Sequence, residues 1–458
     1  MKATRALAQQ EFGDADLGDA RRTRRLVEIA SAVAMRPRGA VTQVVAGAAA
    51  REGAFRFVEN DSIDSAAIGA ASHEATARRC SSVAEVIVAV DQSTLTLTDR
   101  VGKPGFGRTG PRADSRATGG FQVMTALAIR RDQVVEGILG QQWWARYEKS
   151  PDYRHDERPR DERESGMWER TIKQAESVMA AAAPNSRAWY QLDRGADSRA
   201  VLELAVDASV RITVRSAYNR TLASGHHLHT AMQRQRVRGT FTLQVSTADR
   251  SQRKARLLLR SAQVKLRLNA PRGNQRRVVD VSCVYVVEQH ARKRHDRLEW
   301  WLLTTGPAST FAEALDVVRN YTARWRVEEF HRAWKSGVSN IENSQLRSAA
   351  AFKRWATISA AVAARAERLK TISRAEPDRP ALSELSPEEI DAAILLSETR
   401  RHARGDALTL SQAVALIADI GGYSGKSSGG PPGTRVIQRG LEEVITASRV
   451  LRAVARQK

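Results

Sequence analysis

The chain has 458 residues, too many for one simple hydrophobic core, so we expect two or three domains. No apolar stretch approaches the length of a membrane span, and residues 1–16 carry charges of both signs without the apolar core of a signal peptide. The two cysteines, Cys80 and Cys283, can build neither a disulfide framework nor a zinc site. These features exclude a membrane protein and a disulfide-stapled secreted domain, and they favour a cytoplasmic setting.

The formal net charge of +22 indicates a polyanionic partner, and nucleic acid is the usual one. A generally basic proteome or a solubility device could produce the same total. The charge is patchy, however, because residues 250–277 contain ten Lys or Arg and no Asp or Glu, interleaved with leucines and Val264. We therefore expect this stretch to follow a nucleic-acid backbone.

Residues 1–68 are predicted to be a small helical domain that contacts duplex DNA. A helix should begin at the segment Leu17–Asp19, carry arginines on one side and apolar residues on the other, and end at Pro37. A second apolar-periodic segment runs from Val41 to Phe57. The arginines expected to face DNA from these helices are Arg21, Arg22, Arg25 and Arg56.

Residues 69–372 are predicted to form a mixed sheet followed by helices. Asp91 follows the first expected strand, Asp193 follows a later one, and the pattern is helical from Phe311 to beyond Leu369. Strands before helices, with acids at strand ends, predict an α/β nuclease-like domain. The strands are expected at residues 86–90, 121–129, 134–139, 189–192, 210–214, 278–287 and 298–304.

The segment from Tyr321 to Lys335 carries the most specific pattern in the chain. On a continuous helix, at about 100° per residue, Tyr321, Arg324, Glu328 and Lys335 fall within about 60° of one another. Phosphodiester chemistry requires an acid that can bind metal beside groups that bind phosphate. The alternative is an amphipathic helix with a solvated charged face, although apolar residues leave few positions free for it.

Residues 373–458 begin with a polar, proline-containing linker at 375–380 and then predict two helices, Leu408–Ile420 and Arg435–Val454. Apolar residues recur every three or four positions along the last helix. This regular stripe predicts a surface for a partner helix. It consists of Ile437, Leu441, Val444, Ser448 and Leu451.

Two-metal phosphoryl transfer requires carboxylates on separate elements that converge on divalent ions about 3.5–4 Å apart. Asp91, Asp193 and Glu328 have a suitable order, and their hard oxygen ligands suit Mg²⁺, with Mn²⁺ as a substitute. The order alone is weak support. Asp91 could be a turn residue at a strand end, and Asp193 could be a helix N-cap.

The motif Tyr321-x-x-Arg324-x-x-x-Glu328-x-x-x-x-x-x-Lys335 resembles the Y-R-E-K motif of bacterial cut-and-paste transposases of insertion-sequence family four. The helix motif is highly specific, and individually modest segments extend the resemblance nearly from end to end. Gln92 departs from the family, which usually has a small hydroxyl residue there, and so do Met35 and Arg36. The supporting segments are Leu17–Thr23, Glu52–Phe57, Val90–Ser93, Trp143–Trp144, Glu164–Trp168, Asp193–Asp197, Trp300–Thr304 and Leu410–Gly422.

The resemblance implies an RNase H-like core whose catalytic and metal-binding triad is Asp91, Asp193 and Glu328, with two metal ions. It places a β-rich insert at about residues 235–300 and gives Trp300 the role of stabilising a flipped base when the DNA end forms a hairpin. The N-terminal region would bind terminal inverted repeats, and the C-terminal helices would form a homodimer in the synaptic complex. The residues that would hold the phosphates of the DNA end are Tyr321, Arg324 and Lys335. Arg332 is also expected to bind DNA.

The predicted function is therefore a bacterial DNA transposase, acting in the cytoplasm at the nucleoid, that excises an element through a hairpin and joins it to target DNA. The rival from another class is a non-catalytic DNA-binding repressor derived from a transposase. A third option is an RNase H-like nuclease without strand transfer. The intact acids favour the enzyme over the repressor, and the phosphate-gripping residues favour a transposase over the nuclease.

Overall fold

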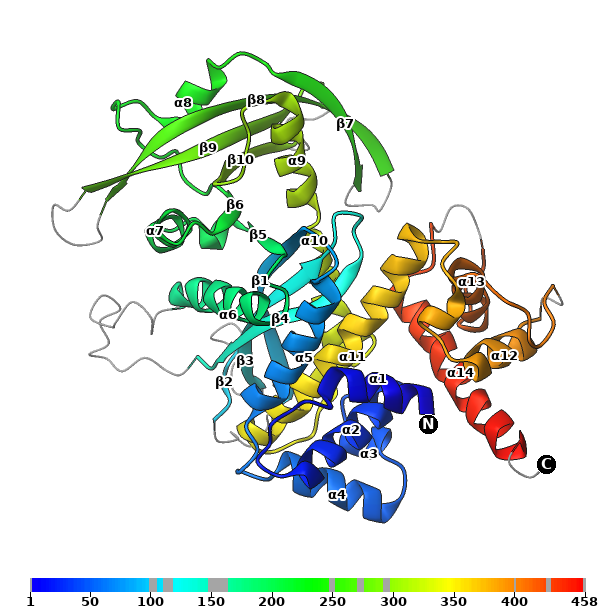
Figure 1. Ribbon diagram of the computed structural model, residues 1–458. Coiled ribbons are helices and arrows are strands. Elements are labelled where there is room, and N and C mark those ends of the chain that lie inside the picture. Colours follow the sequence, from blue (N-terminus) through cyan, green and yellow to red (C-terminus); the bar gives the residue numbers. More distant parts are fainter. Residues whose placement is uncertain are drawn as a thin grey trace.

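A computed structural model of the chain describes residues 2–98, 105–109, 118–146, 164–246, 252–269, 276–290, 297–398, 401–425 and 430–455. They form a large mixed sheet with helices on both faces (Figure 1). The N-terminal helices lie at the end of the molecule opposite strands β7, β8 and β9, and the C-terminal helices lie on the other side of α11, at the right in Figure 1.

The described residues form one ten-stranded sheet in the order β2-β3-β1-β5-β6-β10-β9-β8-β7, with β4 also paired to β3. Strand β1 is antiparallel to β3 and parallel to β5, and β5 is parallel to β6. From β6 onward each neighbour is antiparallel. The strands are β1 Glu85–Thr98, β2 Gly107–Arg108, β3 Thr118–Ile129, β4 Val135–Trp144, β5 Arg187–Leu192, β6 Arg211–Arg215, β7 Gly239–Ser246, β8 Gln252–Asn269, β9 Arg276–Glu288 and β10 Glu299–Thr304.

Helices cover both faces of the sheet because alternate side chains of its strands are apolar on each face. One face packs against α6 and α7, and the other packs against α9, α10 and α11. None of the described helices combines the length and the apolar character that a bilayer crossing requires. The helices of this region are α5 Ser65–Cys80, α6 Gly166–Ala182, α7 Arg199–Asp207, α8 Leu228–Gln233, α9 Phe311–Thr322, α10 Trp325–Arg332 and α11 Ala349–Ala375.

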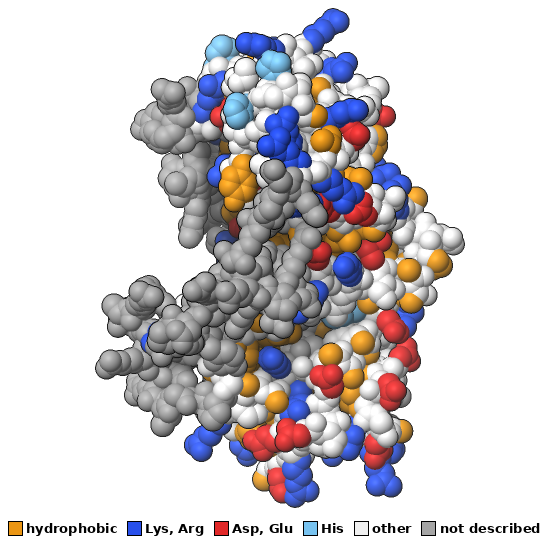
Figure 2. Space-filling view, turned by 90° about the vertical axis from the view of Figure 1, so that its left-hand side faces the viewer, with side chains coloured by type: hydrophobic (Ala, Val, Ile, Leu, Met, Phe, Trp, Pro, Cys, Tyr) orange, Lys and Arg blue, Asp and Glu red, His pale blue; other side chains and the backbone are white. Residues whose placement is uncertain are grey.

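Much of the basic stretch 250–277 lies in strand β8. In its first half the odd-numbered residues are buried, and Leu257 packs in the cluster under α9. In its second half the even-numbered residues are buried, and Leu266 packs on the opposite face. Basic side chains such as Arg256 and Lys265 take the exposed positions in both halves. Lys and Arg side chains accordingly recur over the upper part of the surface in Figure 2.

The N-terminal helices are α1 Lys2–Phe12, α2 Ala20–Met35, α3 Val41–Val44 and α4 Ala48–Val58. Asp19 caps α2, as the sequence predicts, by accepting a hydrogen bond from the backbone N–H of Arg21. The apolar-periodic segment after α2 is two helices rather than one, because Gly47 between them has a φ of 87°. The expected domain boundary at residue 68 falls inside α5.

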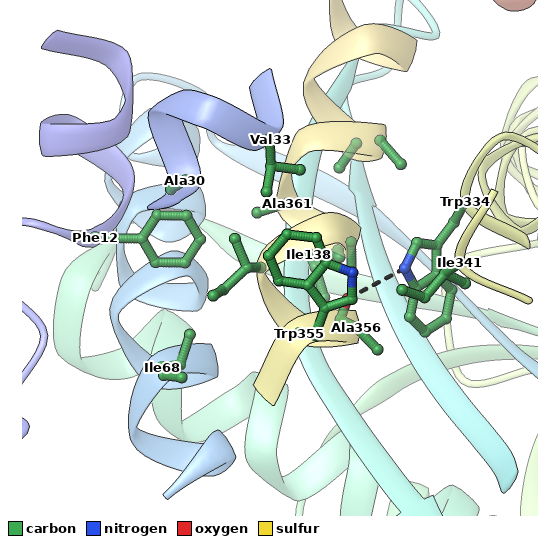
Figure 3. Close-up of a cluster of buried hydrophobic side chains, with 14 of the residues drawn as sticks. Phe12, Ala30, Val33, Ile68, Ile138, Trp334, Ile341, Trp355, Ala356 and Ala361 are labelled. Carbon is green, nitrogen blue, oxygen red and sulfur yellow. Dashed lines mark hydrogen bonds between the residues drawn. The ribbon is translucent and has the colours of Figure 1, made fainter. Parts of the chain in front are cut away.

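The N-terminal helices share a hydrophobic core with the sheet and α11. Trp355 of α11 lies between Phe12 and Ala30 on one side and Trp334 and Ile341 on the other (Figure 3). The indole Nε1 of Trp334 donates to the backbone oxygen of Ala356 at 3.1 Å, and that of Trp355 donates to the oxygen of Gly39 at 2.8 Å. The helical N-terminal segment is thus packed directly on the central domain.

The C-terminal helices are α12 Pro387–Leu396, α13 Leu410–Ile420 and α14 Thr434–Ala455. The stripe on α14 is buried within the chain, where Ile437, Leu441 and Val444 pack against α12, α13 and the end of α11. The expectation that this stripe forms a partner surface is therefore corrected. The sequence analysis missed α12, whose apolar side chains cover the stripe, although Ser386 and Glu389 form a capping box at its start.

Candidate active site

Two aspartates meet where the pairing of β1 and β5 stops. The parallel register ends with Val90 opposite Leu192, so Asp91 and Asp193 are the next residues on two neighbouring strands. The Asp193 carboxylate accepts a hydrogen bond from the backbone N–H of Gly195 at 2.7 Å, which caps a short 3-10 turn. The sheet thus brings together two acids that are far apart in the sequence.

Strand β1 continues through Asp91 to Thr98, so this aspartate does not end a strand as the sequence suggested. It pairs with Thr125 of β3. Successive side chains of a strand alternate between its faces, so Asp91 shares the face of Ala89, which packs toward α10 and α11. This is the face on which α10 presents Glu328.

The segment from Tyr321 to Lys335 is not one continuous helix, as the motif spacing assumed. Helix α9 ends at Thr322 and α10 begins at Trp325. Between them the backbone N–H of Arg324 bonds three residues back to the oxygen of Tyr321, at 3.1 Å. Side chains three residues apart nearly eclipse in such a turn, so the turn keeps Tyr321 and Arg324 on one side of the chain.

Arg324 joins the acids of the site. Its guanidinium Nη2 lies 2.5 Å from Oε1 of Glu328, and Nη1 lies 3.3 Å from Oδ2 of Asp91. Although Nη1 is buried, it makes no hydrogen bond of good geometry among the described residues. The guanidinium therefore compensates charge from two carboxylates that belong to separate elements.

The surroundings of Asp91 raise the pKa of its carboxyl. Burial raises the pKa of its carboxyl to about 6, and the neighbouring Asp193 and Glu328 carboxylates raise it as well. Arg324 acts in the opposite direction and lowers this pKa. Burial and the two neighbouring carboxylates together outweigh Arg324, so ionisation of Asp91 is disfavoured.

An aromatic and cationic group borders these acids. Tyr321 is buried, and its ring lies edge-on to the half-buried Trp300 of β10, with ring centroids 5.8 Å apart. Burial raises the pKa of the Tyr321 phenol, and Arg324 and Arg215 lower it. Burial also lowers the pKa of Arg215, and the nearby Arg194 and Arg324 lower it further. The structure therefore brings Trp300, Tyr321 and Arg324 together.

Lys335 occupies a separate position beside strand β1. It lies in a π-helical turn, Ala333–Gly337, that continues α10. Its Nζ is 3.7 Å from Oε1 of Glu342, and the same oxygen accepts a hydrogen bond from the backbone N–H of Thr96 at 2.8 Å. Among the described residues, its ion pair is with Glu342 rather than with a member of the acidic group.

The predicted DNA-contacting arginines differ in what they touch. The guanidinium of Arg22 donates to the backbone oxygen of Leu17 at 2.9 Å, so this side chain supports the N-terminal fold. Arg25 pairs with Glu28 at 2.9 Å, and Arg56 pairs with Glu52. Arg21 and Arg332 are exposed. None of these arginines is joined by a described ion pair or hydrogen bond to Asp91, Asp193 or Glu328.

The sequence analysis missed Arg215, which ends strand β6 and lies close to Tyr321 and Arg324. It also missed Glu342, which forms an ion pair with Lys335. The position of Arg215, directly after the apolar run of a short strand, is a weak sequence signal for a residue of the site. No pattern in the sequence connects Glu342 to β1, because that contact depends on how the π-helical turn folds back.

The N-terminal part of the chain is similar to a known protein family. Residues 4–63 match the family model described as transposase DNA-binding. This match spans most of helix α1 and all of helices α2 to α4.

One solved structure similar to the chain is the cryo-EM structure of a piggyBac transposase synaptic complex with hairpin DNA. The similarity covers 81% of this chain and 72% of that chain, with 10% sequence identity and a TM-score of 0.37.

Proposed function

We propose that this chain is a DNA transposase that cuts and joins phosphodiester bonds with Asp91, Asp193 and Glu328. The observation that carries the proposal is the convergence of Asp91 and Glu328 on Arg324, with Asp193 close to Asp91 and Tyr321. The transposase DNA-binding segment at residues 4–63 gives the substrate class, since it supports binding of duplex DNA.

The arrangement of the sheet supports an RNase H-like core for this activity. Strands β4, β3 and β1 are antiparallel, and β5 and β6 are parallel to β1. The proposed acids lie on the two central strands of this group and on the helix that covers them. Strands β7, β8 and β9 would be the insert between the second and third acids, and their basic exposed positions suit a DNA backbone.

The donor set fits Mg²⁺, because the candidate ligands are carboxylate oxygens and the half-buried Asp91 lacks full charge compensation. As the side chains stand, no three His, Cys, Asp or Glu residues of the described chain form a ready metal-binding group. Arg324 instead supplies the positive charge between Asp91 and Glu328. Two Mg²⁺ ions held by Asp91, Asp193 and Glu328 would supply charge stabilisation to the attacking and leaving oxygens.

In the proposed reaction, water attacks a phosphodiester at the transposon end and releases a 3′-hydroxyl. That hydroxyl attacks the opposite strand to form a hairpin, and after hairpin opening it attacks the target DNA. Tyr321, Arg324 and Lys335 would hold the phosphates of the DNA end, and Trp300 would stack on a flipped base. Arg332, which is exposed, would contact DNA nearby. The transposon ends would be paired by a homodimer.

A matched pair of variants on α10 tests the enzymatic function. Glu328→Gln should lower cleavage of a duplex carrying the flanking inverted repeat by about 100-fold or more, because a charged ligand is lost. Glu329→Gln is the control, since this neighbouring acid pairs with Arg326 at 2.8 Å and Lys370 at 3.1 Å, outside the acidic group. Both variants should bind the duplex like the unmodified protein in a gel-shift assay with Mg²⁺.

The same assay decides between the enzyme and the repressor alternative. A repressor derived from a transposase would bind the repeat with all three proteins and cleave with none. Substantial cleavage by Glu328→Gln would contradict the assignment of the triad. Sequencing the DNA on both sides of the reading frame provides the repeat for the assay.

A further inference from the structure

A cavity of about 230 Å³ lies where three parts of the chain meet, away from the acidic site. Helices α1 and α2 form one wall, the start of β4 and Arg79 of α5 form the second, and α11 forms the third. The turn at Ser383 and Glu384, before α12, completes the lining. The cavity therefore touches the DNA-binding segment, the central sheet and the C-terminal region at once.

The carboxylates of this cavity already have cationic partners. Glu11 accepts from Arg79 at 2.8 Å and from the hydroxyl of Ser72 at 2.6 Å. Glu136 is buried and pairs with Arg368. Glu384 also pairs with Arg368, at 3.0 Å. These three acids are thus neutralised within the protein and have little need of a cation from solution.

Arg365 differs from the other arginines of the cavity. It lines the cavity from α11, and no hydrogen bond or ion pair joins its guanidinium to another described residue. Burial lowers the pKa of this guanidinium, and the nearby carboxylates of Glu389, Glu384 and Glu11 raise it. A partly buried guanidinium with unused donors favours an anionic ligand, since its fork of N–H groups matches a carboxylate or phosphate.

The remaining lining limits the size and character of that anion. Phe12, Ala30 and Ala361 belong to one apolar cluster that borders the cavity (Figure 3). Leu7 and Ala8 of α1 add further apolar surface. The volume suits a small molecule and excludes a DNA duplex.

We propose that this cavity binds a small organic anion, with its carboxylate or phosphate group on Arg365 and a short apolar body against α1 and α2. The bound molecule would connect the DNA-binding segment to α11 and to the turn before α12. It would stabilise the packing of the N-terminal helices on the sheet, because a ligand that binds the folded state shifts the unfolding equilibrium.

The test measures binding of hexyl phosphate and of hexanoate to the full chain by isothermal titration calorimetry and by thermal unfolding. Inorganic phosphate and NaCl at matched ionic strength are the reference arms. We expect at least one of the two amphiphilic anions to bind and to raise the unfolding temperature more than the reference salts. Binding of inorganic phosphate as tight as that of hexyl phosphate would contradict the apolar part of the proposal.

Arg365→Met should weaken binding by about tenfold or more, because it keeps an unbranched side chain and removes the charge. Arg374→Met is the matched control, since it removes a charge from the same helix outside the cavity. Equal affinity of Arg365→Met and the unmodified protein, or no binding of either probe, would overturn the site.

A second variant keeps the test decisive if Arg365→Met does not fold. Ala34 of α2 lines the cavity, so Ala34→Leu should fill part of it while leaving Arg365 in place. Binding of the amphiphilic anions should be lost in this variant. Native-like affinity of Ala34→Leu would show that the anions bind elsewhere, and the proposal would fail.

Discussion

At the scale of single residues, the buried charge of Asp91 determines a pH dependence. Its carboxyl has a pKa of about 6 and must be ionised to act as a metal ligand. Protons should therefore compete with Mg²⁺ for this carboxylate, so the Mg²⁺ concentration that gives half-maximal single-turnover cleavage should rise as the pH falls below about 6, while DNA binding measured by gel shift persists. A half-maximal Mg²⁺ concentration that stays constant from pH 7 to pH 5 would contradict a role for Asp91 as a metal ligand.

Ionised Asp91 should also lower the free energy of unfolding of the protein. The pKa of Asp91 is higher in the folded protein than the ordinary value of 3.8, so the folded state holds the proton more tightly. Ionised Asp91 therefore destabilises the fold above about pH 6, and this cost disappears below about pH 4. Asp91→Asn should raise the free energy of unfolding at pH 8 by roughly 1–3 kcal/mol and leave it nearly unchanged at pH 4.

Urea unfolding at both pH values measures this effect. Asp280→Asn is the control, because Asp280 is exposed on β9 and should change stability little at either pH. A loss of stability in Asp91→Asn at pH 8 would mean that the pairing with Arg324 outweighs the cost of burial.

Trp300 offers a test of the proposed base-trapping role. Trp300→Ala should impair hairpin formation and leave first-strand nicking intact, because a flipped base would lose roughly 1–3 kcal/mol of stacking. Trp300→Phe keeps a ring beside Tyr321 and should restore part of the hairpin product on a denaturing gel. If Trp300→Ala forms hairpins at the normal rate, the flipped base is held elsewhere.

At the scale of elements, Gly47 shows how one backbone angle separates two helices. Its φ of 87° suits glycine, and no atom lies within 4 Å of the position that a Cβ would occupy. Gly47→Ala should therefore lower the free energy of unfolding by about 1–2 kcal/mol through backbone strain alone.

Gly53 provides the contrast within the next helix. It lies inside α4 with an ordinary helical φ, so Gly53→Ala should raise stability by about 0.5–1 kcal/mol if Arg25 moves slightly aside. Chemical denaturation of both variants tests the comparison. Equal effects at the two positions would show that the break between α3 and α4 does not depend on the φ of Gly47.

At the scale of the whole molecule, the stripe on α14 stabilises the chain itself. The side chain of Leu441 is buried where α14 packs on α12 and α13. Leu441→Ala should therefore lower the free energy of unfolding by about 2–4 kcal/mol. Val450 lies on the same helix and is 61% exposed, so Val450→Ala should cost about 0.5 kcal/mol or less. Urea unfolding gives the two values, and light scattering gives the oligomeric state. If Leu441→Ala dissociates a dimer without loss of stability, the stripe joins two chains.

The sequence by itself determined features that depend on local pattern. Alternating apolar runs predicted the strands around residues 121–129 and 189–192, and Asp19 predicted the start of α2. The predictions of these strands and of this helix start succeeded because hydrophobic periodicity and capping act over a few residues. The spacing within Tyr321–Lys335 singled out Arg324 and Glu328, whose side chains form an ion pair, and their role in catalysis stays a prediction.

The tertiary structure decided what depends on contacts between distant segments. It set Asp91 beside Asp193 through the parallel pairing of β1 and β5, and it placed Arg324 between Asp91 and Glu328. It also buried the α14 stripe against a helix that the sequence analysis missed. An apolar stripe has the same pattern whether its partner is the same chain or another one, so only the packing of the folded chain could assign it.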